Sequence, residues 1–333
     1  MTHAVVTGGC GFVGSHLTEY LTGHGSQVTV FDAAGPGPDA TGPVRYVRGD
    51  VRDAAPLGEA ITEGTDVVYH LSAVVGVDRY LSAPAEVVET NLLGTLNVLR
   101  RAAAVGAKVV LASTSEVYGK NPATPWHEDA DRVLGSTSVD RWSYSTSKAL
   151  AEHLAFAYAR QYGARIAIVR YFNVYGPRQR PAYVVSRSVH RALRGLAPEV
   201  YDGGAQTRCF TYIADAVAGT VLAGTSAKAD GTCFNIGSHR ESTVAEVVQV
   251  ICELTGVTVP ATALDAVTRF GAQYQDIPRR VPDTTRAREV LGWECTTSLR
   301  DGLSQTISWA RDNPWWLDHL PDEQPAQKSA SLR

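Results

Sequence analysis

Six short apolar runs recur along the first half of the chain, and segments with helical spacing separate them. The runs span residues 3–7, 27–31, 44–47, 66–71, 108–112 and 165–170. Strand-length apolar runs that alternate with helices are typical of buried parallel strands joined by crossover helices. The pattern therefore predicts an α/β fold built on a Rossmann-type doubly wound parallel sheet.

Two long helical segments lie between these runs. Residues 85–105 carry Val88, Leu92, Leu96 and Leu99 at helical spacing, and good helix formers follow Tyr144. After about residue 178 the chain changes to helical runs at 184–194, 243–254 and 298–311, mixed with short strands and turns. We predict a first domain over residues 1–178, with contributions from about 211–240, and a smaller C-terminal α/β cap over 179–315. The polar residues 322–333 are predicted to be disordered.

Composition narrows the class of protein. The chain has 333 residues, 44% of them hydrophobic, and a net charge of −3 without a basic block, so we expect no nucleic-acid partner. No apolar run approaches the roughly 18 residues of a membrane span, and the chain begins directly with a strand, which argues against a signal peptide. The five cysteines are scattered and form no Cys-x-x-Cys pair. These features predict a cytoplasmic protein without a metal site.

A glycine-rich turn follows the first predicted strand. Residues 9–14 fit the pattern G-x-G-x-x-G and precede a helical segment, and Asp32 ends the next strand. Glycines let the backbone approach a pyrophosphate at a helix N-terminus, and a carboxylate at this distance binds an adenosine ribose. The acid favours NAD over NADP, because it would repel a ribose phosphate. The alternative, glycines needed only for packing, leaves Asp32 unexplained.

Tyr144 and Lys148 lie one helical turn apart in the predicted helix. A nearby ammonium favours the phenolate and lowers the pKa of the phenol. Such a tyrosine can take a proton from an alcohol while a hydride leaves the same carbon. The alternative is an exposed helix face with no chemical role.

Polar residues also follow the fifth predicted strand. Thr114, Ser115 and Glu116 come at its carboxyl end, where open α/β sheets bind their ligands, so we expect them near a bound nicotinamide. Glu116 could instead merely begin a turn. His70 is expected to be a hydrogen-bonded core residue, and Asn91 either faces solvent or supports the site. The second half is rich in arginine, and a few of these side chains could clamp a diphosphate.

Together these motifs resemble the extended short-chain dehydrogenase/reductase family, in its nucleotide-sugar epimerase/dehydratase branch, from about residue 3 to 312. The resemblance implies NAD, a nucleoside-diphosphate sugar as substrate, and a homodimer packed through helices near 85–104 and 144–160. It assigns the following residues to the cofactor: Gly8, Gly11, Phe12, Val13, Asp32, Asp50, Val51, Leu71, Ala73, Asn91, Tyr144, Lys148 and Tyr171. It assigns a second set to the substrate: Arg141, Asn173, Arg178, Arg208, Tyr274 and Arg280.

Three segments resemble one subgroup, the UDP-glucuronic acid decarboxylases. Residues 113–119 look like the signature of that subgroup, because Ser115 stands where the sugar dehydratases have an acid and because 4-epimerases usually lack a glutamate at Glu116. Residues 141–148 and 274–283 are similar to the decarboxylase domain of the aminoarabinose lipid-A pathway. Arg280 matches its catalytic arginine, and Arg279 would do so if the register slips by one.

The resemblance implies a reaction with named roles. Tyr144, supported by Lys148 and Thr114, assists oxidation at C4 by NAD, and the resulting β-keto acid loses carbon dioxide. Ser115, Glu116 and Arg280 complete the catalytic set, and the product is UDP-4-keto-xylose, UDP-xylose or both. The alternatives are a UDP-glucuronate or UDP-hexose 4-epimerase, a nucleotide-sugar dehydratase, and a non-catalytic NAD-binding regulator. Residues 74–80 differ from the decarboxylase groups and leave the sugar open.

Overall fold

Seven parallel strands form the central sheet of the computed structural model, which describes residues 2–38, 40, 42–258, 261–265, 268 and 275–318. Their order is β11-β6-β5-β4-β1-β2-β3. The strands are β1 (His3–Thr7), β2 (Gln27–Asp32), β3 (Val44–Arg48), β4 (Val67–His70), β5 (Lys108–Thr114), β6 (Ile166–Tyr171) and β11 (Thr232–Ile236). The six predicted strands and the doubly wound sheet are confirmed. The seventh strand comes from the second half of the chain.

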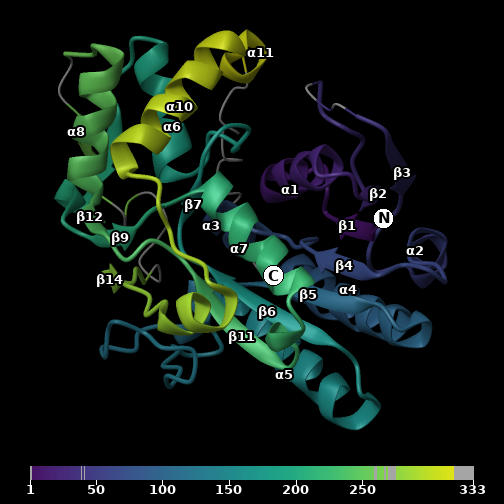
Figure 1. Cartoon of the computed structure of the whole chain (residues 1–333). Helices are drawn as coiled ribbons and strands as arrows, with labels where there is room; N and C mark the ends of the chain where they lie inside the picture. Colours follow the sequence, from purple (N-terminus) through teal and green to yellow (C-terminus); the bar gives the residue numbers. More distant parts are fainter. Residues whose placement is uncertain are drawn as a thin grey trace, which may run out of the picture.

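Helices cover both faces of this sheet, so its central strands are buried on both sides. Helices α1 (Phe12–Gly23) and α7 (Ile213–Thr225) pack together on one face, and α4 (Pro84–Val105) and α5 (Ser143–Tyr162) pack together on the other (Figure 1). The short α2 (Ala54–Ala60) packs against α4. All seven residues of β5 are buried. In the described part of the chain, no helix has both the length and the apolar character that crossing a bilayer requires.

Local signals explain where the long helices begin and end. Helix α4 starts at Pro84 and stops before Gly106, which adopts the left-handed conformation (φ 74°) that suits glycine. The predicted apolar stripe of α4 is only partly correct, because Val88 is 37% exposed. The buried face instead includes Val87, Asn91 and Val98, since α4 packs against α5 as well as the sheet.

The second half of the chain forms a separate group of helices, α6 (Val184–Leu193), α8 (Val244–Thr255), α10 (Leu299–Asp312) and α11 (Pro314–Leu317), beyond the carboxyl ends of the strands (Figure 1). Three small sheets accompany them: β12 (Glu241–Thr243), β9 (Thr207–Cys209) and β14 (Arg279–Arg280); β8 (Glu199–Tyr201) and β13 (Thr262–Leu264); and β7 (Val174–Tyr175) and β10 (Thr211–Tyr212). Shorter helical segments are α3 (Val77–Ser82), η1 (Ser115–Tyr118), η2 (Asp140–Trp142), η3 (Asp202–Gly204), η4 (Ala227–Ala229) and η5 (Ala287–Leu291). The expected tail at 322–333 lies outside the described residues.

The segment between η1 and η2, expected to be a polar loop, contains a buried anchor. Trp126 is fully buried and stacks on Tyr118 with ring centroids 4.9 Å apart. Its backbone N–H donates to the carbonyl of Val281 at 2.8 Å, and its carbonyl accepts from the N–H of Asp283 at 2.8 Å. Pairing with residues 281–283 therefore holds the segment between η1 and η2 against the rest of the protein. The polar composition of the segment gave no sign of this contact.

Gly14 tests how tightly α1 packs on the turn that precedes it. A Cβ at this position would overlap the carbonyl oxygen of Gly8, whereas a Cβ at Gly23, in the same helix, meets nothing within 4 Å. We expect Gly14→Ala to lower the free energy of unfolding by about 1–3 kcal/mol. The matched control, Gly23→Ala, should be neutral or stabilise by roughly 0.5 kcal/mol. Denaturant unfolding of the two variants measures this, and equal stabilities would contradict the packing argument.

Candidate active site

The glycine turn between β1 and α1 leaves no room for a side chain at Gly8, Gly9 or Gly14. Gly8 has φ 73°, and a Cβ there would lie 2.7 Å from the backbone nitrogen of Ser72. Asp32, at the end of β2, accepts the N–H of Cys10 at 2.9 Å and the N–H of Ala34 at 2.9 Å. A hydrogen bond thus joins the glycine turn to Asp32. A pyrophosphate could approach the backbone of the turn at the N-terminus of α1, and the carboxylate beside it could accept from a ribose hydroxyl. These features fit a dinucleotide.

The remaining predicted cofactor residues lie near the carboxyl ends of other strands. Asp50 and Val51 follow β3, and Leu71 and Ala73 follow β4. Gly11 precedes α1, whose first residues are Phe12 and Val13.

Asn91 and Tyr171 have specific partners. Asn91 is buried, accepts the N–H of Val74 at 3.0 Å and donates to the Ser147 hydroxyl at 3.1 Å. It therefore supports the site rather than facing solvent, because it joins the segment after β4 to the helix that carries Tyr144. The Tyr171 hydroxyl pairs with that of Thr220 on α7 at 2.7 Å.

Tyr144 and Lys148 occupy the first turns of α5 and are both buried. Burial raises the pKa of Tyr144, and a hydrogen bond with Thr114 works in the opposite direction. Burial lowers the pKa of Lys148 to about 8, and its ammonium donates to the carbonyl of Ala112 at 2.9 Å. The expected lowering of the Tyr144 pKa is therefore not seen, because burial and the negative charge of Glu116 both raise it and outweigh the hydrogen bond with Thr114.

Tyr80 contacts Tyr144 directly, although the sequence analysis gave no role to this residue within the segment 74–80. Its ring is 3% exposed and stacks on that of Tyr144, with centroids 4.8 Å apart and planes 9° apart. Tyr80 lies in α3, within residues 74–80. No periodic pattern or motif marked it, since stacking depends on how α3 and α5 pack.

Glu116 lies between two buried arginines. Its Oε2 accepts from Arg141 Nη1 at 2.5 Å, and its Oε1 accepts from Arg280 Nη1 at 3.2 Å. Burial alone would raise the pKa of Glu116, but the two guanidinium groups outweigh it and bring the pKa to about 2. The charge of Glu116 in turn raises the pKa of both Tyr80 and Tyr144. The acid–base pair and the charged cluster therefore form one site.

Arg279 and Arg280 differ in their contacts. Arg280 is buried and faces Glu116, whereas Arg279 is exposed and pairs with Glu241, with Nε 2.8 Å from Oε1. Neighbouring residues of a strand point to opposite faces, so one register places only one of them in the site. Ser115 is buried beside Glu116 at the start of η1.

The predicted substrate residues are not all gathered around Glu116. Arg208 is opposite Arg280 in the β9–β14 pair, and its Nη2 donates to both carboxylate oxygens of Asp276 at 3.0 Å. Asn173 has φ 41° and donates to the carbonyl of Cys209 at 3.3 Å, while Arg178 pairs with Glu19 on α1 at 2.8 Å. Tyr274 lies outside the described residues.

His70 has the structural role expected of it. Its two ring nitrogens pair with the hydroxyls of Thr7 at 2.8 Å and Thr95 at 3.2 Å, and burial lowers its pKa to about 3. Across the described ranges, no group of three or more His, Cys, Asp or Glu residues is arranged to hold a metal ion.

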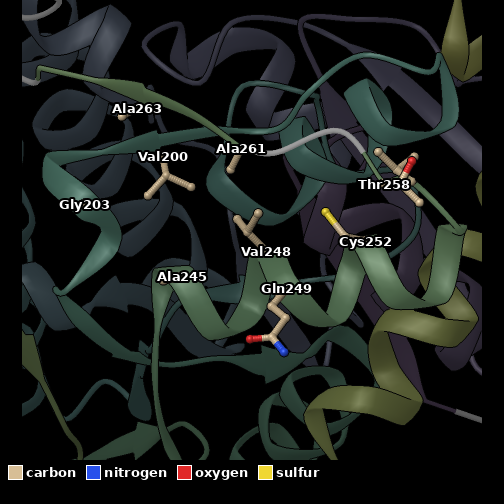
Figure 2. Close-up of a pocket in the computed structure, with 10 residues that line it drawn as sticks. Val200, Gly203, Ala245, Val248, Gln249, Cys252, Thr258, Ala261 and Ala263 are labelled. Atoms are coloured by element: carbon tan, nitrogen blue, oxygen red, sulfur yellow. The ribbon is translucent and has the colours of Figure 1, made fainter.

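A pocket of about 450 Å³ lies elsewhere, between α8, β8 and β13. Figure 2 shows Val248 and Cys252 on α8 beside Ala261 and Val200, so the lining is largely apolar. Of the predicted site residues that the structure describes, none lines it. The candidate active site therefore lies at the carboxyl ends of the strands and not in this pocket.

Comparison with known proteins gives one family and a consistent group of relatives. Residues 4–237 match the NAD dependent epimerase/dehydratase family. A UDP-N-acetyl-alpha-D-glucosaminuronate decarboxylase of Bacillus cytotoxicus is 40% identical over 316 residues, covering 92% of this chain and 97% of the relative. UDP-glucuronic acid decarboxylase 1 of Danio rerio is 35% identical over 340 residues, covering 99% of this chain and 77% of the relative.

Solved structures agree on the fold. A UDP-glucose 4-epimerase of Thermotoga maritima with UDP-glucose gives a TM-score of 0.86 at 29% identity, covering 94% of this chain and all (100%) of the other. MoeE5 in complex with UDP-glucuronic acid and NAD gives a TM-score of 0.81 at 33% identity, covering 93% and 99%. Both were solved with a UDP-linked sugar.

The pKa of Glu116 leads to a pH-dependent contribution to stability. The ordinary value is 4.5 and the folded value about 2, so the contribution is complete above pH 4.5 and is lost as the pH falls towards 2. We expect the difference in unfolding free energy between wild type and Glu116→Gln to shift by about 2 kcal/mol, against the wild type, between pH 7 and pH 3. Denaturant titrations of both proteins at both pH values measure this shift. The other titrating groups are the same in the two proteins, so their contributions cancel in the difference. A difference independent of pH would contradict the charged cluster.

Proposed function

Because this chain belongs to the NAD dependent epimerase/dehydratase family, we propose that it is an NAD-dependent decarboxylase of a UDP-linked uronic acid, with UDP-glucuronate as the substrate. The observation that carries the proposal is Glu116 between Arg141 and Arg280, beside Tyr144. Two guanidinium groups and one carboxylate leave one positive charge in this cluster. The charge is the same when Asp276, 3.9 Å from Arg280, is counted together with its partner Arg208. Such a charge suits the carboxylate on C5 of a uronic acid, whereas a neutral hexose has no group to balance it.

Oxidation at C4 needs a proton acceptor in a dry site. NAD, the cofactor of the family, supplies the hydride acceptor when it is bound and can return the hydride to the same carbon. Tyr144 acts as a phenolate and takes the proton from the 4-hydroxyl. Burial and Glu116 disfavour this phenolate, whereas the Thr114 hydrogen bond and the charge of Arg141 favour it. Lys148, with a pKa near 8, is charged for much of the time at neutral pH and favours that phenolate.

Loss of carbon dioxide follows from the new ketone. The C4 carbonyl makes the C5 carboxylate part of a β-keto acid, so the electron pair of the breaking C5–C6 bond moves into an enolate at O4. Tyr144, protonated in the first step, donates a hydrogen bond to that oxygen. Arg141 and Arg280 orient the departing carboxylate, while Glu116 and Ser115 hold the water that protonates C5. The hydroxide left by that water takes up a proton from the solvent, so the reaction consumes one proton for each carbon dioxide released. Hydride return then gives UDP-xylose, and release before that step gives UDP-4-keto-xylose.

UDP-N-acetylglucosaminuronate is a second candidate substrate. The Bacillus cytotoxicus relative is named for it and is 40% identical, against 35% for the Danio rerio protein. Tyr80 and its neighbours lie beside Tyr144 in the segment unlike those of UDP-glucuronate decarboxylases, which is consistent with a different substituent on the sugar. Both substrates carry the C5 carboxylate, so the reaction and the roles above are unchanged.

Epimerisation, dehydration and NAD binding without catalysis each account for less of the site. A 4-epimerase of a neutral hexose uses Tyr144, Lys148 and Thr114 but offers no carboxylate to the two arginines beside Glu116. A 4-epimerase of UDP-glucuronate binds the same carboxylate, and the mass of the product separates it from a decarboxylase. A dehydratase needs an acid where Ser115 stands. A non-catalytic NAD-binding regulator leaves the buried tyrosine and lysine without a purpose.

The oligomeric state and the ligand bound by each domain are also part of this proposal. We place the dinucleotide on residues 1–178 and the nucleotide sugar against residues 179–315. Asn173 and Arg178, at the end of the first segment, and Arg208, in the second, border the substrate. We further propose that the protein is a cytoplasmic homodimer packed through α4 and α5. Exposed apolar side chains on these helices, including Leu93 (44%) and Leu150 (45%), are consistent with such an interface.

Direct incubation tests the reaction and the sugar together. Purified protein is mixed with NAD and either UDP-glucuronate or UDP-N-acetylglucosaminuronate, and the products are identified by mass spectrometry. We expect a nucleotide sugar lighter by one carbon dioxide from at least one substrate, and the rates show which sugar is preferred. An isobaric product with a new retention time would instead mean epimerisation, and no product from either would reject the proposal.

Tyr144→Phe separates chemistry from cofactor binding. The variant keeps the ring that stacks on Tyr80 but lacks the hydroxyl, so we expect turnover to fall by at least about a hundredfold. The affinity for NAD, measured by calorimetry, should change little. Tyr162→Phe is a control in the same helix, because Tyr162 is 67% exposed. Substantial turnover by Tyr144→Phe would disprove the assigned base.

A further inference from the structure

Asn235 uses all the polar atoms of its side chain, although it is fully buried. Its Nδ2 donates to the carbonyls of Trp126 at 2.8 Å and Asp283 at 3.0 Å, and its Oδ1 accepts from the Tyr118 hydroxyl at 2.7 Å. Its backbone N–H donates to Glu128 Oε1 at 2.8 Å. No predicted role in the sequence involved this residue, which lies on β11 at the edge of the main sheet.

The orientation of the Asn235 amide follows from its neighbours. Arg170 Nη1 donates to the Tyr118 hydroxyl oxygen at 2.8 Å, and a guanidinium cannot accept a hydrogen bond. The Tyr118 hydroxyl therefore donates its own proton to Asn235 Oδ1. The NH₂ group is left for the two carbonyls, so a flipped amide would bring like groups together at all three contacts.

These contacts connect the two segments that carry the charged cluster. Tyr118 ends η1, two residues after Glu116, and Asp283 lies three residues after Arg280. Glu116 follows a strand of the main sheet, whereas Arg280 lies on β14, 164 positions further along the chain. Trp126, whose carbonyl accepts from Asn235, also stacks on Tyr118 and so strengthens the same connection.

We propose that Asn235 is a positioning residue that sets the separation between the Glu116 carboxylate and the Arg280 guanidinium, an inference that rests on the proposed decarboxylation. Its amide is a rigid bridge of three hydrogen bonds between η1 and the segment after β14. The hydride-transfer residues Tyr144, Lys148 and Thr114 do not take part in this bridge. Loosening it should therefore slow cleavage of the C5–C6 bond more than oxidation at C4.

Asn235→Asp tests this with little change of shape. A carboxylate oxygen replaces the NH₂ group and faces two carbonyl oxygens, which repel it. A shift of the order of 1 Å in such a site costs about a hundredfold, so we expect the rate of carbon dioxide release to fall at least about tenfold, with NAD affinity unchanged. Because C5–C6 cleavage becomes more rate-limiting, the ¹³C isotope effect on carbon dioxide should rise and the deuterium effect at C4 should shrink.

Two further variants make the test decisive. Tyr118→Phe keeps the ring against Trp126 and removes the hydroxyl link to Asn235, together with the hydrogen bond from Arg170 Nη1, which keeps the Glu128 carbonyl as an acceptor. Both isotope effects should move in the same directions by less. The control Asn313→Asp alters an amide that donates to the Trp309 carbonyl at 2.8 Å near the C-terminal helices, and neither isotope effect should change. Thermal unfolding and NAD binding identify the folded variants. If Asn235→Asp does not fold, Tyr118→Phe alone decides.

The outcomes separate this inference from the proposed function. Failure of the wild type to release carbon dioxide from either uronic acid would reject the function itself. Release by the wild type, together with wild-type isotope effects in the folded Asn235 and Tyr118 variants, would overturn the positioning role only.

Discussion

The ion cluster of Glu116, Arg141 and Arg280 constrains the rest of this site. Each group is at least nine-tenths buried, and an unpaired charge in such surroundings costs several kcal/mol. The three side chains come from η1, η2 and β14, so each of these segments must reach the same place for any of the charges to be satisfied. The connection after η1 is accordingly packed down by Trp126 rather than left in solvent, and the pairing of β14 with β9 carries Arg280 inward.

The parallel sheet explains why chemistry gathers around this cluster. Strands β1, β2, β4, β5 and β6 all end on the same side, so the glycine turn, Asp32, Thr114 and Glu116 share one edge. Tyr144 and Lys148 reach that edge from α5, which lies against β5. Decarboxylation and epimerisation can thus begin from the same oxidation at C4. What happens next depends on the groups near C5, and here these groups carry a net positive charge.

Buried polar contacts give the site its geometry as well as its charge. Asn91 joins the segment after β4 to α5, and Asn235 joins η1 to the segment after β14. Both amides have partners for donors and acceptor alike, so neither can turn without leaving a buried group unsatisfied. The low dielectric that makes an unsatisfied buried group costly also strengthens the electrostatic attraction between the guanidinium groups and a substrate carboxylate.

Local sequence signals were sufficient for the strands, the main helices and the glycine turn with Asp32, and they marked Tyr144, Lys148 and Glu116 as candidates. Strand and helix periods, glycine spacing and residue type all act over a few positions, and a single chain displays them directly. Resemblance extended this to Arg280 but left Arg279 open, because choosing between neighbours on a strand needs the register. Tyr80 over Tyr144, Trp126 beneath Tyr118, and the bridge through Asn235 were decided only by the tertiary structure. These contacts join segments separated in the sequence, and their geometry depends on how helices and strands pack, which no local pattern encodes.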